Sequence, residues 1–494
     1  MYNKKINKMI IGKHILDTIS IGMYNYPLMV FREYIQNSAD AIDHLRRTSN
    51  SKTSNSKIEI TLNGRSRSIK IQDYATGIKA KEALSTLHNI GKSLKKSNSN
   101  RGFRGIGRLG GLGYCDELSF VTKAKGESIY SVSKWDCKKL RELISNNNDS
   151  LDAMKLVKSI AVLSQHKYTK NKNDHFFSVE MHNVRSSRNV LLDVPVIKSY
   201  LSQVAPVSFK NDFSFTEKIE KKLKAKIPNY ETYDIFVNGD QIFKPYIDAV
   251  KVGEKITDKI KDIDFVEFSN GAGLLTFGWI ANLGLFGKVS STGLVDGMRV
   301  RSGNILVGNK DLLCDYFRER RFCNYLVGEL HIIDHRLVLN SRRDDFEDSQ
   351  YKEEFYNHFV KEIGLPFSKK IREASEDRSQ TQKQLSNNKL LNTAKGIINN
   401  GYIAEEQKEE IIIKLNNLRI DKGLEDDSEN IDNLLTRLNS SVHLLDSRKR
   451  RGKGKAMSYS QKKSMLKSIC DIIYEECADK EQASKIVDKI VKQF

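Results

Sequence analysis

Short stretches of alternating hydrophobic and polar residues dominate the first half of the chain, and their period of two predicts β-strands. Residues 58–62 and 68–72 alternate on either side of an Asn-Gly dipeptide, which is typical of a hairpin turn. The same alternation predicts further strands at 118–122, 129–132 and 176–184. Residues 1–45 instead predict two helices, and another helix is expected near 194–203.

A different pattern begins after about residue 215, where a Lys-rich stretch at 217–226 indicates a change of domain. Residues 233–240 predict one more strand and turn. Several short strands broken by glycine follow between 274 and 339, and they predict an α+β middle domain over residues 216–370. Two arginines alternate with apolar residues at 298–301, so we expect their side chains to face a partner or the solvent.

Glycine becomes sparse beyond about residue 375, and apolar residues recur there at helical spacing. We therefore expect a helical C-terminal region, with its apolar stripes used for helix packing or for a dimer contact. The predicted fold class is α+β in three parts: residues 1–215, 216–370 and 371–494.

The helix predicted at residues 31–43 carries polar groups along one stripe. At about 3.6 residues per turn, Glu33 and Asn37 lie one above the other, and Asp40 follows on the same stripe. A carboxylate beside an amide oxygen suits a base for a water molecule next to a ligand for a hard cation. The alternative is an ordinary surface helix with a solvated polar stripe.

A second motif lies where the strand at 68–72 ends, with Asp73 followed by a turn at Gly77. A carboxylate at a strand end can accept a hydrogen bond from an exocyclic amine. A glycine beside it lets a flat base approach the backbone. The two residues together therefore predict a pocket for a nucleotide base.

A third motif is the run at residues 101–113, which holds six glycines in thirteen positions. Such a run does not suit a helix interior, but it exposes backbone N–H groups that can bind phosphates. A glycine-rich loop alone is weak evidence, because flexible turns look similar. Three motifs in this order make coincidence a poor explanation.

In these motifs the chain resembles the GHKL ATPases, the Bergerat-fold superfamily of gyrase, heat-shock chaperone, histidine kinase and mismatch-repair protein. Its closest likeness is to the ninety-kilodalton heat-shock chaperones. Their first motif reads Phe-Leu-Arg-Glu-Leu-Ile-Ser-Asn-Ala-Ser-Asp-Ala, and residues 31–41 follow it almost position by position. The resemblance implies an N-terminal Bergerat-fold α/β sandwich with a lid at about 80–113, followed by a transducer-like middle domain.

The resemblance also implies roles for individual residues. Glu33 would be the general base that orients the attacking water, and Asn37 would be the Mg²⁺ ligand. Asp73 would read the adenine, and Lys92 would contact phosphate. The full nucleotide-binding set implied in this way is Asn37, Asp40, Asp73, Gly77, Ile78, Lys92, Gly102, Gly105, Ile106, Gly107 and Ser178.

The chain departs from the family pattern at two places. Ala75 stands where the family usually has glycine, and a methyl group is tolerable there if the residue keeps a negative φ. The family also places Gly-Thr before an apolar strand, where this chain has residues 176–181. Ser178 would replace that threonine hydroxyl only with a shift in register.

A later segment, residues 337–344, resembles the chaperones' middle-domain Leu-Pro-Leu-Asn-x-Ser-Arg-Glu sequence. An arginine there reaches back to the γ-phosphate, and its best match is Arg343, with Arg342 second. A guanidinium suits the charge that develops on phosphoryl oxygens. The alternative is a surface pair that forms salt bridges with Asp344 and Asp345.

By this resemblance we expect an ATPase, an acid-anhydride hydrolase that uses ATP and Mg²⁺ to drive lid closure and clamping of a homodimer. The clamp would act on a protein client or on the product of a neighbouring gene in the same operon, in a chaperone-like role. The alternative is a clamp associated with DNA or RNA, similar to mismatch-repair or microrchidia ATPases, and a role in bacterial defence is one form of it. A scaffold that binds ATP without turnover is disfavoured, because Glu33 is present.

The formal net charge of +20 favours nucleic acid or acidic proteins as partners. The densest basic run lies in residues 447–455 and is not interleaved with aromatic residues, so a solvated linker is an equal alternative. No apolar run approaches the roughly 20 residues needed to cross a bilayer, and a cytoplasmic location is expected. The six cysteines form no C-x-x-C pair, so neither a zinc site nor a disulfide is expected.

Overall fold

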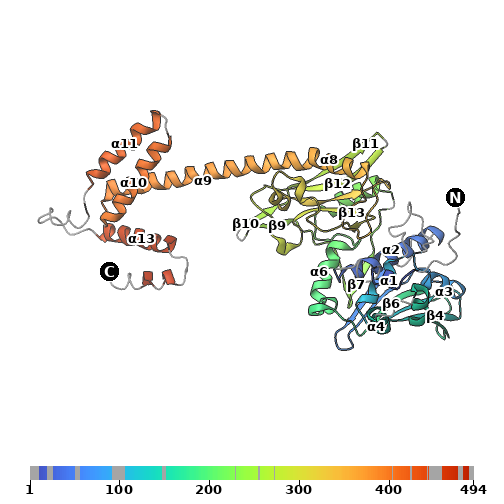
Figure 1. Cartoon of the computed structure of the whole chain (residues 1–494). Helices are drawn as coiled ribbons and strands as arrows, with labels where there is room; N and C mark the ends of the chain where they lie inside the picture. Colours follow the sequence, from blue (N-terminus) through green and yellow to red (C-terminus); the bar gives the residue numbers. More distant parts are fainter. Residues whose placement is uncertain are drawn as a thin grey trace. The chain divides into compact units, whose positions relative to one another are not determined.

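A computed structural model of the chain describes residues 11–18, 26–49, 56–91, 106–146, 152–228, 230–253, 256–271, 273–402, 404–422, 425–441, 443, 459–476, 482–484 and 486–488. The chain forms two compact units, Met1–Ser375 and Glu376–Phe494. The first unit contains an eight-stranded, a five-stranded and a two-stranded sheet, whereas the second is helical in its described part (Figure 1). The predicted α+β class is therefore confirmed.

The eight-stranded sheet has the order β5-β4-β3-β6-β2-β1-β7-β8. Its strands are β1 (Lys57–Asn63), β2 (Ser68–Asp73), β3 (Glu117–Lys123), β4 (Ile129–Asp136), β5 (Ala161–Lys167), β6 (Phe176–His182), β7 (Asp234–Val237) and β8 (Asp240–Gln241). The predicted hairpin is confirmed, because β1 and β2 pair antiparallel with Ile60 opposite Ile71. The strands expected near 118–122, 129–132 and 176–184 are also present.

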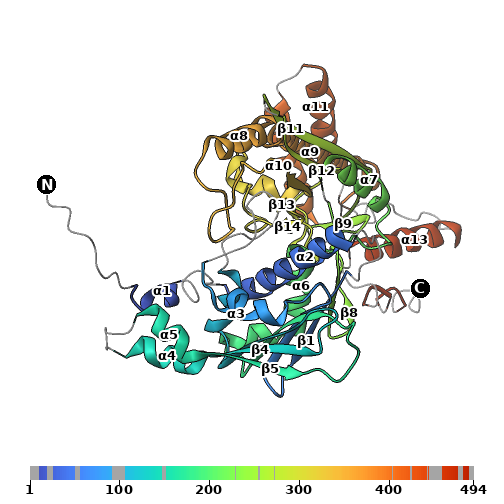
Figure 2. The same ribbon diagram turned by 90° about the vertical axis from the view of Figure 1, so that its right-hand side faces the viewer.

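Helices cover one face of this sheet (Figure 2). They are α1 (His14–Asp17), α2 (Met29–Ser49), α3 (Ala80–His88), α4 (Cys137–Ser145), α5 (Ala153–Ile160) and α6 (Val194–Val204). The long helix α2 buries Tyr34, Ile35 and Ala39 in the same core as Ile60 and Ile71, and this packing fixes its polar stripe over the sheet. The helices expected in residues 1–45 and near 194–203 are thus confirmed.

The strand and turn at 233–240 correct the expected domain boundary. They were assigned to the middle domain, but β7 pairs parallel with β1, with Ile235 opposite Ile58. The chain therefore returns to the N-terminal sheet after the Lys-rich helix α7 (Thr216–Lys226). Local sequence could not show this, because parallel pairing joins strands that lie far apart along the chain.

The middle part of the chain is built on a five-stranded sheet in the order β11-β12-β15-β13-β14, with a separate β10-β9 pair. These strands are β9 (Ala249–Val252), β10 (Ile256–Lys259), β11 (Asp262–Asn270), β12 (Gly273–Asn282), β13 (Gly297–Ser302), β14 (Ile305–Leu306) and β15 (Val327–Ile332). Helix α8 (Gln350–Phe359) packs on this sheet through Phe355 and Phe359. The sheet confirms the expected α+β middle region.

Two arginines of β13 are not where the sequence predicted. Arg299 and Arg301 were expected to face a partner or the solvent, but both are fully buried. Both faces of β13 are covered, and the Arg301 guanidinium reaches Glu329 on the neighbouring strand. The prediction was wrong because alternation between apolar and polar residues does not reveal a buried ion pair.

Glu329 lies at the centre of this buried charged cluster. It accepts hydrogen bonds from Arg301 Nε at 2.6 Å, Lys244 Nζ at 2.7 Å and Tyr246 Oη at 3.0 Å. His331 Nε2 is 3.2 Å from the same carboxylate. Burial opposes ionisation, but Arg301 and Lys244 nevertheless hold the pKa of Glu329 well below its ordinary value.

We predict that His331 makes the folded protein sensitive to acid. Burial lowers the pKa of His331 to about 4, from an ordinary value near 6.5. Between these values the unfolded imidazole binds a proton that the folded one does not, so stability falls as the pH falls through this window. The expected loss is about 3 kcal/mol, measured by denaturant unfolding at pH 7 and pH 4.

The variant His331→Gln supplies the comparison, since its amide still donates to Glu329 but does not titrate. Its unfolding free energy should fall less than that of the wild type over the same pH range. Parallel pH curves for the two proteins would contradict the assignment.

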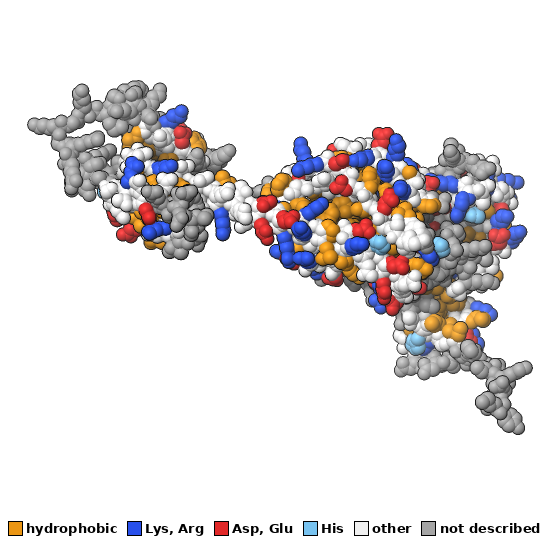
Figure 3. Space-filling view, turned by 90° about the horizontal axis from the view of Figure 1, so that it is seen from above, with side chains coloured by type: hydrophobic (Ala, Val, Ile, Leu, Met, Phe, Trp, Pro, Cys, Tyr) orange, Lys and Arg blue, Asp and Glu red, His pale blue; other side chains and the backbone are white. Residues whose placement is uncertain are grey.

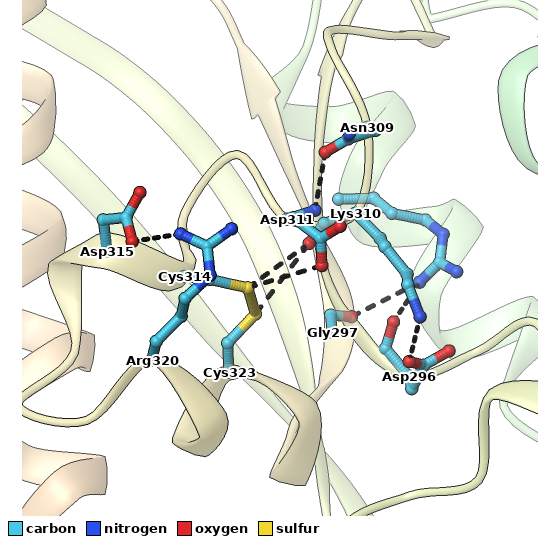
Figure 4. Close-up of a disulfide and its surroundings, with 10 residues drawn as sticks. Asp296, Gly297, Asn309, Lys310, Asp311, Cys314, Asp315, Arg320 and Cys323 are labelled. Carbon is cyan, nitrogen blue, oxygen red and sulfur yellow. Dashed lines mark hydrogen bonds and ion pairs between the residues drawn. A yellow bond between two sulfur atoms is a disulfide. The ribbon is translucent and has the colours of Figure 1, made fainter.

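One disulfide corrects the expectation of unpaired thiols. Cys314 and Cys323 are bonded, with their Cα atoms 5.0 Å apart (Figure 4). They lie on two short 3₁₀ turns, Cys314–Tyr316 and Arg320–Tyr325, which fold back toward each other. The spacing of the cysteines along the sequence did not reveal the Cys314–Cys323 disulfide. The free cysteines among the described residues are Cys115, Cys137 and Cys470.

The C-terminal region is helical, as predicted. Its helices are α9 (Leu365–Asn400), α10 (Glu405–Lys422), α11 (Glu425–Asn439) and α13 (Tyr459–Glu476). Leu415 and Leu438 are fully buried in a small core that joins α10 and α11. The basic run at 447–455 lies outside the described residues. None of the helices within the described ranges is long and apolar enough to cross a membrane.

Candidate active site

The polar stripe of α2 is buried rather than solvated. Glu33 and Asp40 are each 3% exposed, and Asn37 is half-buried between them. An ionisable group is seldom this deeply buried unless it has partners or a function. The surface-helix alternative therefore does not describe this stripe.

Asp73 ends β2 on the same side of the sheet and is 1% exposed. Its Oδ1 accepts a hydrogen bond from the Ala75 backbone N–H at 3.1 Å, which holds the start of the turn. Ala75 does not take a positive φ, so its methyl group is tolerated as expected. Gly77 has a φ of +64°, and a Cβ there would lie 2.0 Å from the carbonyl oxygen of Lys123. Only glycine fits at this position.

Ser178 does not lie where the sequence analysis expected. Asp73 is opposite Phe177 in the β2–β6 pair, so Ser178 points to the other face of the sheet, alongside Gln72. Its hydroxyl donates to Glu180 instead. The hydroxyl near the turn is that of the buried Thr122, which is opposite Phe177 and accepts a hydrogen bond from the Ile78 backbone N–H at 2.8 Å. Thr122 is a site residue that sequence reasoning missed, because its position depends on strand register.

The glycine-rich run is partly described. Lys92, Gly102 and Gly105 lie outside the described residues. Gly107 begins a 3₁₀ helix, Gly107–Gly113, directly after Ile106. A Cβ on Gly107 would lie 2.4 Å from Glu33 Oε2. The loop backbone thus lies directly against the Glu33 carboxylate, and this approach requires glycine.

Tyr34 anchors this glycine-rich segment to α2. Its hydroxyl donates to the Arg108 carbonyl at 3.1 Å and accepts from the Gly111 N–H at 3.0 Å. A Cβ on Gly111 would come within 2.4 Å of the same hydroxyl. The helix that carries Glu33 therefore also holds the loop beside it.

Arg343 reaches the same carboxylate from the middle part of the chain. Its Nη1 is 3.1 Å from Glu33 Oε1 and also donates to Gln36 Oε1. Arg343 has a left-handed backbone with a φ of +58°, and its N–H donates to the Asn340 carbonyl. Arg342 is exposed and makes no such contact with Glu33. Of the two arginines, the structure brings only Arg343 to the candidate base.

The alternative for this pair, salt bridges to Asp344 and Asp345, is not what the structure shows. Asp345 pairs with Lys352 at 2.7 Å, and Asp344 accepts from the Asn340 amide. Sequence reasoning also missed Arg32. This residue donates through Nη2 to the Arg342 carbonyl at 3.0 Å and through Nη1 to the Arg343 carbonyl at 3.4 Å. It thereby ties the arginine loop to α2.

Arg108 is another residue missed from sequence. It follows Gly107 directly, its guanidinium donates to the Asn89 carbonyl, and its Nε has no hydrogen-bond partner among the described residues. Burial lowers the pKa of Arg108. A half-buried guanidinium beside a glycine-rich loop suits an anionic ligand.

The oxygen ligands on α2 fit a magnesium ion. Mg²⁺ favours a few protein oxygens together with phosphate oxygens and water. Within the described residues no group of three or more His, Cys, Asp or Glu forms a closed metal cage. The Asn37 amide oxygen and the Asp40 carboxylate, one turn apart on α2, are oxygen donors of the kind that Mg²⁺ prefers.

We predict that Asp73→Asn weakens ATP binding by roughly 10- to 150-fold, because one charge-assisted hydrogen bond is worth about 1.5–3 kcal/mol. Ser178→Ala is the matched control, since Ser178 lies on the opposite sheet face. Titration calorimetry should show unchanged affinity for the control. Equal affinities of Asp73→Asn and wild type would mean that the base pocket is misplaced.

Comparison with known proteins agrees with this geometry. Residues 25–170 match the family model of histidine kinase-, DNA gyrase B-, and HSP90-like ATPases. The matched region contains α2, the Asp73 turn and the glycine-rich run, and it ends before Ser178 and Arg343. A search of curated proteins found no match to the chain. Over residues 25–170 the chain therefore matches the GHKL ATPase superfamily.

Proposed function

We propose that the protein hydrolyses ATP and that the reaction is completed by an arginine from the middle part of the chain. Domains of this superfamily bind ATP, and three features support turnover here. Glu33 is a buried carboxylate, Asn37 and Asp40 offer oxygen ligands, and Gly107 exposes backbone next to Glu33. Mg²⁺, when bound, would neutralise phosphate charge and orient the phosphoryl group.

The contact between Arg343 and Glu33 carries this proposal. A guanidinium 3.1 Å from the candidate base lies where a γ-phosphate would also come close. The phosphate would compete for Arg343, and the released carboxylate could then orient a water in line with the γ-phosphoryl group. Arg343 would meanwhile stabilise charge on the transferred oxygens.

Hydrolysis would then depend on the position of the arginine loop, residues 340–345. That dependence makes a local reaction into a conformational switch. From the resemblance we further expect that two copies of the chain form a clamp and that this clamp acts on a macromolecular partner. The resemblance to the chaperones favours a protein client. A group of exposed lysines and aromatic rings outside the candidate site instead favours nucleic acid.

Magnesium removal tests the proposed activity. The purified chain should release phosphate from ATP with excess Mg²⁺, and chelation with EDTA should lower this rate to background. Readdition of Mg²⁺ should restore it. Phosphate release that continues in EDTA would contradict the proposed site or reveal a contaminating enzyme, and the inactive Glu33 variant described below distinguishes these two.

A further inference from the structure

Strands β4 and β5 form one edge of the N-terminal sheet (Figure 2), and exposed lysines and aromatic rings occur together in these strands and the loops beside them. We call this cluster the strand-end patch. Its members are Lys125, Lys167, Lys170 and Lys172 with the rings of Tyr130, His166 and Tyr168. None of these residues belongs to the candidate active site.

Backbone pairing brings these lysines together from two segments. The Gly126 N–H donates to the Lys172 carbonyl at 2.8 Å, so Lys125 and Lys172 lie on neighbouring loops. Lys167 is directly opposite Ile129 in the β4–β5 pair. All four lysines are exposed. The positive charges are therefore concentrated at one end of the sheet.

The rings form a small flat surface among the lysines. Tyr130 and His166 are opposite each other in the β4–β5 pair and stack with centroids 5.3 Å apart and planes at 28°. Tyr168 contacts Tyr130 edge-on, with centroids 6.1 Å apart. Because β5 is the last strand of the sheet and His166 is exposed, this stack is open to a flat ligand.

The four lysines of the patch outnumber the two neighbouring acids, Glu127 and Asp174. No carboxylate in the described part of the chain lies within ion-pair distance of the four lysines. Two acids lie beside the lysines and both accept hydrogen bonds: Glu127 accepts from the Ala80 N–H at 3.1 Å, and Asp174 accepts at 2.8 Å from the hydroxyl of Tyr168, a member of the patch. The buried Lys123 adds a fifth positive charge beneath them.

We propose that the strand-end patch binds single-stranded nucleic acid. Lysine ammonium groups would neutralise its phosphates, and unpaired bases would stack on the Tyr130–His166 pair. A duplex would use the charges but not the rings, because its bases are already stacked and paired. An acidic polypeptide would likewise leave the ring stack unused. This inference does not depend on ATP hydrolysis.

The patch is also connected to the candidate nucleotide pocket. Glu127, in the loop after Lys125, accepts from the first residue of α3, and Gln165 donates to the Ala80 carbonyl at 3.0 Å. The carbonyl of Lys123 lies against Gly77. A ligand on the patch would thus contact the loop that supports the base-binding turn.

The test measures binding of a labelled twenty-nucleotide single strand by fluorescence anisotropy, without ATP, over a range of salt concentrations. The variant Lys125→Gln/Lys167→Gln/Lys170→Gln/Lys172→Gln should raise the apparent Kd at least tenfold. Its logarithmic salt slope should fall by about 3, since each phosphate contact on a single strand contributes about 0.7. His166→Ala should raise Kd about fivefold or more without changing that slope.

A charge-matched control is needed, because basic side chains are spread widely over the surface (Figure 3). The control variant Lys251→Gln/Lys259→Gln/Lys261→Gln/Lys288→Gln removes four other exposed lysines, from the β9–β10 region. It should keep the wild-type Kd within twofold. All variants should keep the wild-type melting temperature and basal ATPase rate.

Three results would overturn the proposal. Equal weakening by both quadruple variants would show a net-charge effect alone. Duplex binding as tight as single-strand binding, with no effect of His166→Ala, would show that the rings are not used. If the wild type bound no oligonucleotide but did bind labelled polyglutamate, the patch would be assigned to an acidic protein partner. Loss of ATPase activity alone would not affect the proposal.

Discussion

Replacing Glu33 with glutamine is expected to lower kcat for ATP hydrolysis by about 10²–10⁴-fold, the usual contribution of a positioned general base. Glutamine keeps the shape and hydrogen-bonding reach of the side chain but cannot accept a proton from water. Because Glu33 is 3% exposed and Gly107 packs against it, a substitution of similar size avoids disturbing the loop. ATP affinity, measured by calorimetry, should remain close to that of the wild type.

The control for this variant is the melting temperature, which should not fall. An equal rate of phosphate release in Glu33→Gln and wild type would remove Glu33 as the base. Loss of both binding and turnover with an intact fold would instead assign Glu33 to nucleotide binding.

The second large effect is expected from Arg343→Ala, which should lower kcat by about 10²–10³-fold with little change in ATP affinity. Among the described residues of the middle part of the chain, Arg343 is the one that forms an ion pair with Glu33. Its effect should appear in turnover, because charge on the phosphoryl oxygens grows in the transition state. Arg343→Lys should recover only part of the rate, since an ammonium lacks the planar fork of donors.

Arg342→Ala is the matched control, as it removes the neighbouring, exposed arginine side chain. We expect its rate to stay within about threefold of the wild type, which is an ordinary effect of a surface substitution. A larger loss in Arg342→Ala than in Arg343→Ala would reverse the assignment of the two residues.

Much of the fold could be predicted from local pattern. The β1–β2 hairpin followed from alternation around an Asn-Gly turn, and α2 followed from its apolar spacing. The return of β7 to the N-terminal sheet could not be predicted, because nothing in residues 233–240 specifies a parallel partner. The burial of Arg299 and Arg301 was equally hidden, since only tertiary structure brings Glu329 to Arg301.

The residues of the candidate site likewise include some that the sequence could predict and others that it could not. Glu33, Asp73 and Gly77 could be predicted as site residues because their chemistry is encoded within short motifs. Ser178 was misplaced and Thr122 overlooked because strand register decides which side chains share a face. A one-residue difference in register exchanges the two faces of a strand.

Arg343 was identified through resemblance, but its contact with Glu33 was not predictable. The two residues are 310 positions apart, and Arg32 binds the carbonyl groups of the arginine loop that carries Arg343. The sequence contains no local signal for that arrangement.

The most direct test of the central claim is a crystal structure with Mg²⁺ and a nonhydrolysable ATP analogue. We predict the adenine amine hydrogen-bonded to Asp73, the metal on Asn37, and the Arg343 guanidinium moved from Glu33 to the γ-phosphate. An analogue bound elsewhere, or a cleft filled by Phe177 with Arg343 still paired to Glu33, would contradict the account.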